Sequence, residues 1–161
     1  MKNILSTLLV LLLSLTINAQ DTLHISDFEI LNHTSWKGTL TYKDYQSGKE
    51  TTIDVTMQTK IKGEKIISNM QYTYEPNKNN KSSVKIKKNG TYFGNEKVIS
   101  NSLENGKQIF VTTYNGRDNG KKATIYITRT MSKTTLKVVK EVQFKNTKIR
   151  FVRNTYSFTK L

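Results

Sequence analysis

The sequence predicts an all-β protein, an antiparallel up-and-down barrel of roughly eight to ten strands, and three observations carry this prediction. Short runs of Thr, Tyr, Val, Ile and Phe alternate with polar residues, as half-buried strands do. Gly, Asn and Asp interrupt these runs about every 8–12 residues, which is typical of hairpins. Closing such a chain of hairpins into a barrel buries one face and removes open edges. A two-sheet β-sandwich of the same strands is the alternative.

Residues 1–19 have the pattern of a cleavable secretory signal. Lys2 precedes an apolar run from Ile4 to Leu15, and the small residue Ala19 follows a polar stretch. The run is shorter than the roughly 20 residues that cross a bilayer, and no later segment approaches that length. We therefore expect no transmembrane segment and a soluble protein that is secreted or periplasmic after cleavage near Ala19.

Residues 20–161 are expected to form a single domain, since no linker, repeat or change of composition divides them. The chain has no cysteine, so neither disulfides nor a lipidated cysteine can hold it. Its net charge is +14 at pH 7, which favours anionic partners such as envelope polymers, lipid head groups or nucleic acid. Because the lysines recur singly at outward positions, solvated strand faces explain this charge better than a dedicated polyanion site.

A short helix is predicted before the first strand. Ser26 followed by Glu29 fits a capping box, and Phe28 and Leu31 would share its apolar side.

The first strand is predicted near 35–45, with Trp36, Gly38, Leu40 and Tyr42 on one face. The second contains the alternating apolar residues from Ile53 to Ile61. Further strands are predicted near 65–74, 84–88, 91–94, 97–103, 108–115, 122–130, 135–144 and 149–159.

Together, the export signal, the short helix, Trp36 with Gly38 in the first strand and Arg153 in the last strand resemble the calycins, the superfamily of lipocalins and fatty-acid-binding proteins. The resemblance implies a lipocalin-like ligand-binding barrel, similar to exported barrels of Bacteroidetes-type bacteria. It also implies that Trp36 and Arg153 pack together across one barrel end as a cation and ring contact. Lipocalins have a Gly two positions before the Trp, whereas here Gly38 follows Trp36. The resemblance therefore implies an architecture and does not identify a ligand.

The last hairpin suggests a binding site. With Asn146 and Thr147 at its tip, Val142 pairs with Phe151, and Lys140 pairs with Arg153 on the same inward face. Like charges opposite each other on a buried face are unfavourable unless an anion or an acidic side chain lies between them.

We therefore predict that Lys140 and Arg153 hold the carboxylate or phosphate of a ligand, with Tyr42, Tyr72 and Tyr74 as hydroxyl partners. In the alternative interpretation, Arg153 packs on Trp36, and Lys140 reaches water at the barrel mouth or pairs with Asp44.

The residues needed for catalysis or metal binding are sparse. His24 and His33 are the only histidines, both precede the predicted sheet, and there is no cysteine. The sheet therefore lacks the residues that bind zinc or haem and those that form Ser-His-Asp or Cys-His catalytic sites. Asp118 is interpreted as a turn former and Glu141 as an outward strand charge. We expect no enzyme activity, no metal and no cofactor.

The basic stretch from Lys78 to Lys88 contains no aromatic ring, although Tyr92 and Phe93 follow it. Nucleic-acid binding needs interleaved rings, so an anionic envelope surface is the better partner for this stretch.

The sequence favours an exported lipocalin-like protein that binds a small hydrophobic or amphipathic, anionic ligand inside the barrel. The alternative is a basic cell-envelope interaction module that docks on acidic polysaccharide or lipid without catalysis. A ligand-binding barrel requires that Lys140 and Arg153 point inward beside a cavity. A surface interaction module requires only outward lysines and a filled core.

The mature protein should begin at Gln20 or Asp21, because only there does a small residue end the apolar run. N-terminal sequencing of the exported protein checks this, and material beginning at Met1 would contradict it.

Overall fold

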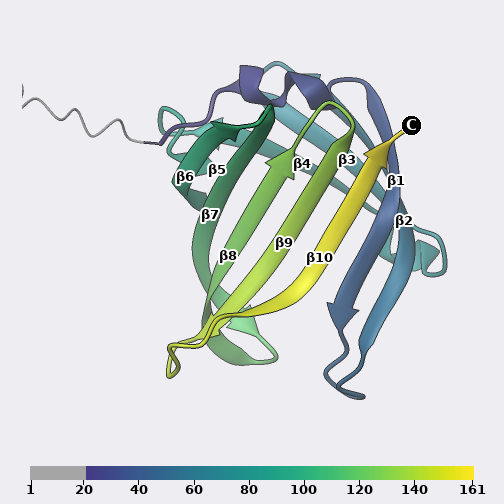
Figure 1. Ribbon diagram of the computed structural model, residues 1–161, viewed down its shortest axis with the longest axis vertical. Helices are drawn as coiled ribbons and strands as arrows, with labels where there is room; N and C mark the ends of the chain where they lie inside the picture. Colours follow the sequence, from purple (N-terminus) through teal and green to yellow (C-terminus); the bar gives the residue numbers. More distant parts are fainter. Residues whose placement is uncertain (1–20) are drawn as a thin grey trace, which may run out of the picture.

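The computed structural model describes residues 21–161, which form one closed antiparallel barrel of ten strands (Figure 1). Each strand pairs with its neighbours in sequence, and β1 closes the barrel against β10. This confirms the up-and-down barrel rather than the two-sheet sandwich. The predicted signal, residues 1–19, lies outside the described residues. Within residues 21–161, no helix is long and apolar enough to span a membrane.

Ten strands were predicted and ten are found, with shifts mainly at their ends. The fourth begins at 80 rather than 84, and the last begins at 151 rather than 149. The strands are β1 (Thr34–Lys43), β2 (Glu50–Lys62), β3 (Lys65–Tyr72), β4 (Asn80–Lys87), β5 (Tyr92–Phe93), β6 (Glu96–Glu104), β7 (Lys107–Asp118), β8 (Lys121–Met131), β9 (Thr135–Phe144) and β10 (Phe151–Lys160).

Two short 3-10 helices accompany the strands, η1 (Ile25–Leu31) and η2 (Pro76–Lys78). The first is the predicted N-terminal helix, and Phe28 and Leu31 are buried as expected. Its start differs from the prediction: the backbone N–H of His24 donates to the Asp27 carboxylate at 2.8 Å, so His24 rather than Ser26 caps the helix.

Helix η1 lies across one end of the barrel (Figure 1, purple). Phe28 is 1% exposed and packs inside this end against Phe93 and Phe110, with both ring centroids 5.5 Å away. Burying rings of this size removes a large apolar area from water. The helix therefore closes this end of the barrel with apolar side chains.

Trp36 fixes the helix to the strands beneath it. Its indole is completely buried, and Nε1 donates to Oγ1 of Thr34 at 2.8 Å and approaches Oγ1 of Thr59 at 3.3 Å. Both hydroxyls also bond to the carbonyl oxygen of Leu31, at 2.9 and 2.5 Å. Every polar group of this cluster is thus paired inside the core, so its burial carries little desolvation cost.

The predicted contact between Trp36 and Arg153 is wrong. Trp36 pairs in register with Lys160 at one end of β10, whereas Arg153 lies near the other end of that strand. The Arg153 guanidinium instead lies 4.2 Å from the ring centroid of Tyr45, in the β1–β2 loop. Seven residues separate Arg153 from Lys160, which is about 23 Å along a strand.

Gly38 allows β1 and β10 to approach closely. It pairs with Phe158, and a Cβ atom at this position would lie 2.0 Å from the carbonyl oxygen of Ser157 and 2.8 Å from the Phe158 ring. A side chain here would force the two strands apart. The glycine beside Trp36 therefore permits barrel closure through its lack of a side chain.

Replacing Trp36 with alanine should lower the free energy of unfolding by about 3–5 kcal/mol, because a fully buried ring leaves a cavity. Trp36→Phe should cost less, since it keeps most of the volume and the two threonine hydroxyls keep their hydrogen bonds to the Leu31 carbonyl. Chemical denaturation of the three proteins measures both effects. An equal loss in both variants would mean that the hydrogen bonds, rather than packing, dominate.

Candidate functional site

The barrel end opposite η1 holds a cavity of about 370 Å³. Leu40 and Ile53 form its apolar inner wall, and the loop before β4 contributes Glu75 and Lys78 to its rim. Four of the five predicted ligand-binding residues line it: Tyr42, Tyr72, Lys140 and Arg153. The structure therefore brings together most of the predicted site.

Tyr74 is the exception. β3 ends at Tyr72, so the alternation that was expected to turn Tyr74 inward has stopped before it. Tyr74 is 75% exposed and does not line the cavity.

A β-bulge sets the position of Arg153. Val142 pairs with Phe151 as predicted, but the register then shifts between Val152 and Asn154, so that Asn154 rather than Arg153 lies opposite Lys140. The predicted pair of Lys140 with Arg153 is therefore wrong by one residue. Because a bulge inserts an extra residue and redirects its side chain, Arg153 still lines the cavity beside Lys140.

Asp118 is the acidic group between the two cations. Its Oδ1 atom lies 3.6 Å from Nε of Arg153 and 3.9 Å from Nζ of Lys140, and Asp118 is 8% exposed. The Tyr45 hydroxyl donates to its other oxygen, and Nη1 of Arg153 donates to the Lys43 carbonyl. The interpretation of Asp118 as a mere turn former is therefore wrong, because it joins three elements at the mouth.

Asp44, the expected alternative partner of Lys140, has a different role. Its carboxylate accepts hydrogen bonds from the backbone N–H of Gln46 at 2.9 Å and from the hydroxyl of Ser47 at 2.7 Å. These bonds lower the pKa of Asp44. Asp44 thus stabilises the turn between β1 and β2.

The charges of the mouth do not balance. Three cations, Lys78, Lys140 and Arg153, line the cavity with two carboxylates, Glu75 and Asp118. The distances from Lys140 and Arg153 to Asp118 exceed the about 2.7–2.9 Å of a charge-assisted hydrogen bond. Burial and the hydrogen bond to Asp118 raise the pKa of Tyr45 to about 12, so this phenol stays neutral at physiological pH. The mouth is therefore a partly buried site with one positive charge in excess.

Two phenols lie close together at the mouth. The hydroxyls of Tyr72 and Tyr156 are 3.0 Å apart, and burial, together with this hydrogen bond, raises the pKa of Tyr156. Tyr156 therefore stays a neutral phenol, and its hydroxyl can donate or accept a hydrogen bond. Tyr156 was not among the predicted site residues, although it alternates with Phe158 along the last strand.

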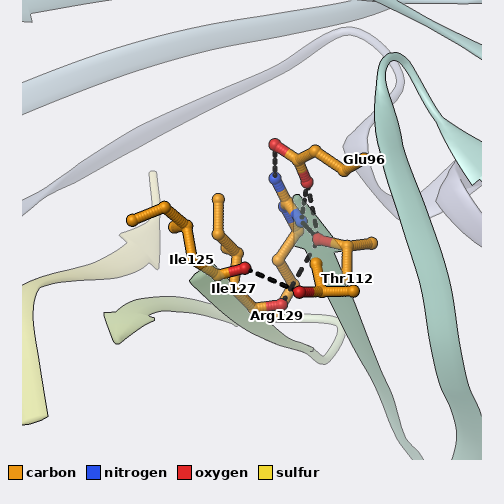
Figure 2. A network of polar contacts seen from close by, with 6 residues as sticks. Glu96, Thr112, Ile125, Ile127 and Arg129 are labelled. Atoms are coloured by element: carbon orange, nitrogen blue, oxygen red, sulfur yellow. Dashed lines mark hydrogen bonds and ion pairs between the residues drawn. The ribbon is translucent and has the colours of Figure 1, made fainter. Parts of the chain in front are cut away.

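A second ion pair lies inside the barrel (Figure 2). Arg129 on β8 contacts Glu96 on β6 at 2.9 and 3.3 Å. The hydroxyl of the completely buried Thr112 bonds to both, at 2.6 Å from Glu96 and 2.9 Å from Arg129. The guanidinium also lies 4.6 Å from the ring centroid of Phe93.

Sequence reasoning missed this pair, although Arg129 alternates with Ile125, Ile127 and Met131 at inward positions. That alternation was the available signal. The Arg129 guanidinium contacts a carboxylate at 2.9 Å, whereas Lys140 and Arg153 approach Asp118 only at 3.9 and 3.6 Å. Among residues 21–161, no three histidine, cysteine or acidic side chains cluster in a way that could hold a metal ion.

No protein-family model matches the chain, and no curated protein matches it. Among solved structures, the chain is similar to a protein of unknown function of the DUF3598 family from Nostoc punctiforme, with 10% sequence identity and a TM-score of 0.38. The match covers 87% of this chain and 49% of that protein, so the chain spans about half of its length.

Proposed function

We propose that this protein binds a small amphipathic anion in the cavity at the mouth of the barrel. Lys140 and Arg153 would hold its carboxylate or phosphate, and its apolar part would lie against Leu40 and Ile53. The observation that carries the proposal is the excess positive charge beside a cavity of about 370 Å³.

The spacing of the charges supports an anionic ligand. Asp118 contacts both cations only at 3.6 and 3.9 Å, so Lys140 and Arg153 keep unused hydrogen-bonding capacity. A ligand oxygen within about 2.7–2.9 Å of either group would make a stronger bond than Asp118 does. An incoming anion could therefore compete with Asp118 for these cations.

The size of the cavity favours a short ligand. Its volume lies near the lower end of the roughly 300–1,000 Å³ that small-molecule sites occupy. The barrel interior beyond it is filled by the core around Trp36, Phe28 and Phe110. Tyr42 and Tyr72 would supply hydroxyl contacts between the apolar wall and the charged rim.

The proposal is for binding without catalysis in an exported protein, as the sequence indicates. Neither histidine lines the cavity: His24 caps η1, and His33 lies between η1 and β1.

Lys140→Met should weaken binding of a medium-chain fatty acid such as decanoate by about 10- to 150-fold, the value of one charge-assisted hydrogen bond. The melting temperature should change little, because methionine keeps most of the side-chain volume and the ion pair is long and partly exposed. A fluorescent fatty-acid displacement titration and a melting curve measure the two effects. Lys137→Met is the matched control, since Lys137 is exposed on the same strand.

Asp118→Asn should have the opposite effect on affinity. The substitution removes the internal carboxylate that competes for Lys140 and Arg153, so decanoate should bind more tightly. The free protein should lose about 1–3 kcal/mol of stability, because two partly buried cations lose their acidic partner.

Decanol, which has the same chain and no charge, separates head-group recognition from simple partitioning into the barrel. Its affinity should not respond to either substitution. Absent decanoate binding in the wild type, or equal changes for decanoate and decanol, would contradict an anion site at the mouth.

A further inference from the structure

The outer surface of the barrel carries an ordered row of cations and rings. Strand register places Lys87, Tyr92, Lys97, Thr113 and Tyr126 side by side across β4 to β8. We call these five residues the outer row. Their neighbours along each strand, among them Phe93, Val98 and Thr112, are buried inside the barrel, and side chains alternate between the two faces of a strand. The row therefore points to the outside.

The outer row borders a hollow in the surface. Tyr92, Lys97, Thr113 and Tyr126 line a depression of about 660 Å³, together with Asn95, Asn115 and other neighbours. None of the described residues that line it is acidic. The hollow thus offers three tyrosine side chains, amide and hydroxyl groups, and a cation.

A second hollow lies beside the first, since Lys87, which lines it, pairs with Tyr92 of the first. It has a volume of about 810 Å³ and is lined by Glu64, Lys85, Lys87 and Lys88, among others. Nζ of Lys88 lies 4.4 Å from the ring centroid of Tyr92, which lines the first hollow. The contact between Lys88 and Tyr92 thus lies at the border of the two hollows.

The nearby acidic groups already have partners. Glu64 binds Lys85 at 2.8 Å, and Glu141, which pairs with Tyr126, contacts Arg150 at 3.7 Å. In the part of the chain that the structure describes, Lys87, Lys88 and Lys97 have no acidic partner; Lys87 donates only to the Asn95 amide oxygen at 3.1 Å. The path along the two hollows is therefore positively charged.

We propose that this surface binds a segment of an acidic polysaccharide whose sugars carry carboxylates. Lys87 and Lys97 stand two strands apart, about 10 Å at the backbone, with Tyr92 between them in the row. A polymer with repeated charges can place a separate carboxylate at each of these cations. Between the cations, the Asn95 and Asn115 amides and the Thr113 hydroxyl suit the hydroxyls of sugar rings.

Two other anionic partners fit less well. The surface is hollowed, whereas a lipid bilayer is flat. Single-stranded nucleic acid binds by stacking its bases on free aromatic faces, but Lys88 covers Tyr92, and Arg150 lies 3.5 Å from the ring centroid of Tyr126. The proposed surface is also outside the barrel, so it can be tested separately from the ligand site at the mouth.

The test uses a triple variant, Lys87→Gln, Lys88→Gln and Lys97→Gln. Its control is Lys37→Gln, Lys60→Gln and Lys137→Gln, which makes the same charge change at exposed lysines on β1, β2 and β9. Binding of polygalacturonate, neutral dextran, vesicles of phosphatidylglycerol and phosphatidylcholine, and oligothymidylate is measured at physiological salt. Melting curves verify that both variants are folded.

We expect the wild-type protein to bind polygalacturonate more tightly than it binds dextran, the vesicles or oligothymidylate. The triple variant at Lys87, Lys88 and Lys97 should lose at least tenfold in affinity for polygalacturonate, and the control variant less than about threefold. An equal loss in both variants would overturn the proposal in favour of a diffuse electrostatic field. Tighter binding of vesicles or oligothymidylate, or no binding of polygalacturonate, would overturn it as well.

Discussion

The closure of one barrel end by η1 is the constraint on which the rest of the structure depends. The carbonyl oxygen of Leu31 accepts hydrogen bonds from the hydroxyls of Thr34 and Thr59. The indole N–H of Trp36 donates to the same two hydroxyls. Phe28 then fills the space beneath the helix. Apolar side chains fill this end of the barrel, and the polar groups around Trp36 are all paired. The cavity with charged groups therefore lies at the opposite end.

The two interior ion clusters differ in how completely their charges are neutralised. Arg129 and Glu96 form one cation with one carboxylate at 2.9 Å, and Thr112 completes their hydrogen bonds. At the mouth, two cations share Asp118 at longer distances. A buried charge with all its partners in place stabilises or specifies a fold, whereas a charge with unused bonds can bind something else. This contrast is why the mouth, and not the inner pair, is the candidate site.

The alternation of side chains along each strand separates the two proposed binding surfaces of the barrel. Inward positions of β8 and β9 carry Ile127 and Lys140, which pair in register, while the next outward position carries Tyr126, paired with Glu141. Adjacent residues therefore face the interior and the outer surface of the barrel, respectively. The basic composition is thus divided between a few inward cations and many outward lysines.

The sequence by itself determined the ten strands, the short helix and the inward direction of Trp36, Tyr42 and Lys140, because these follow from periodicity and turn residues along a short stretch of chain. Only the tertiary structure decided the bulge at Arg153, the exposure of Tyr74 and the separation of Trp36 from Arg153. It also placed Asp118 against Tyr45, a contact across 73 residues of sequence. Such pairings depend on where distant strands meet when the barrel closes, and no local pattern of residues encodes that.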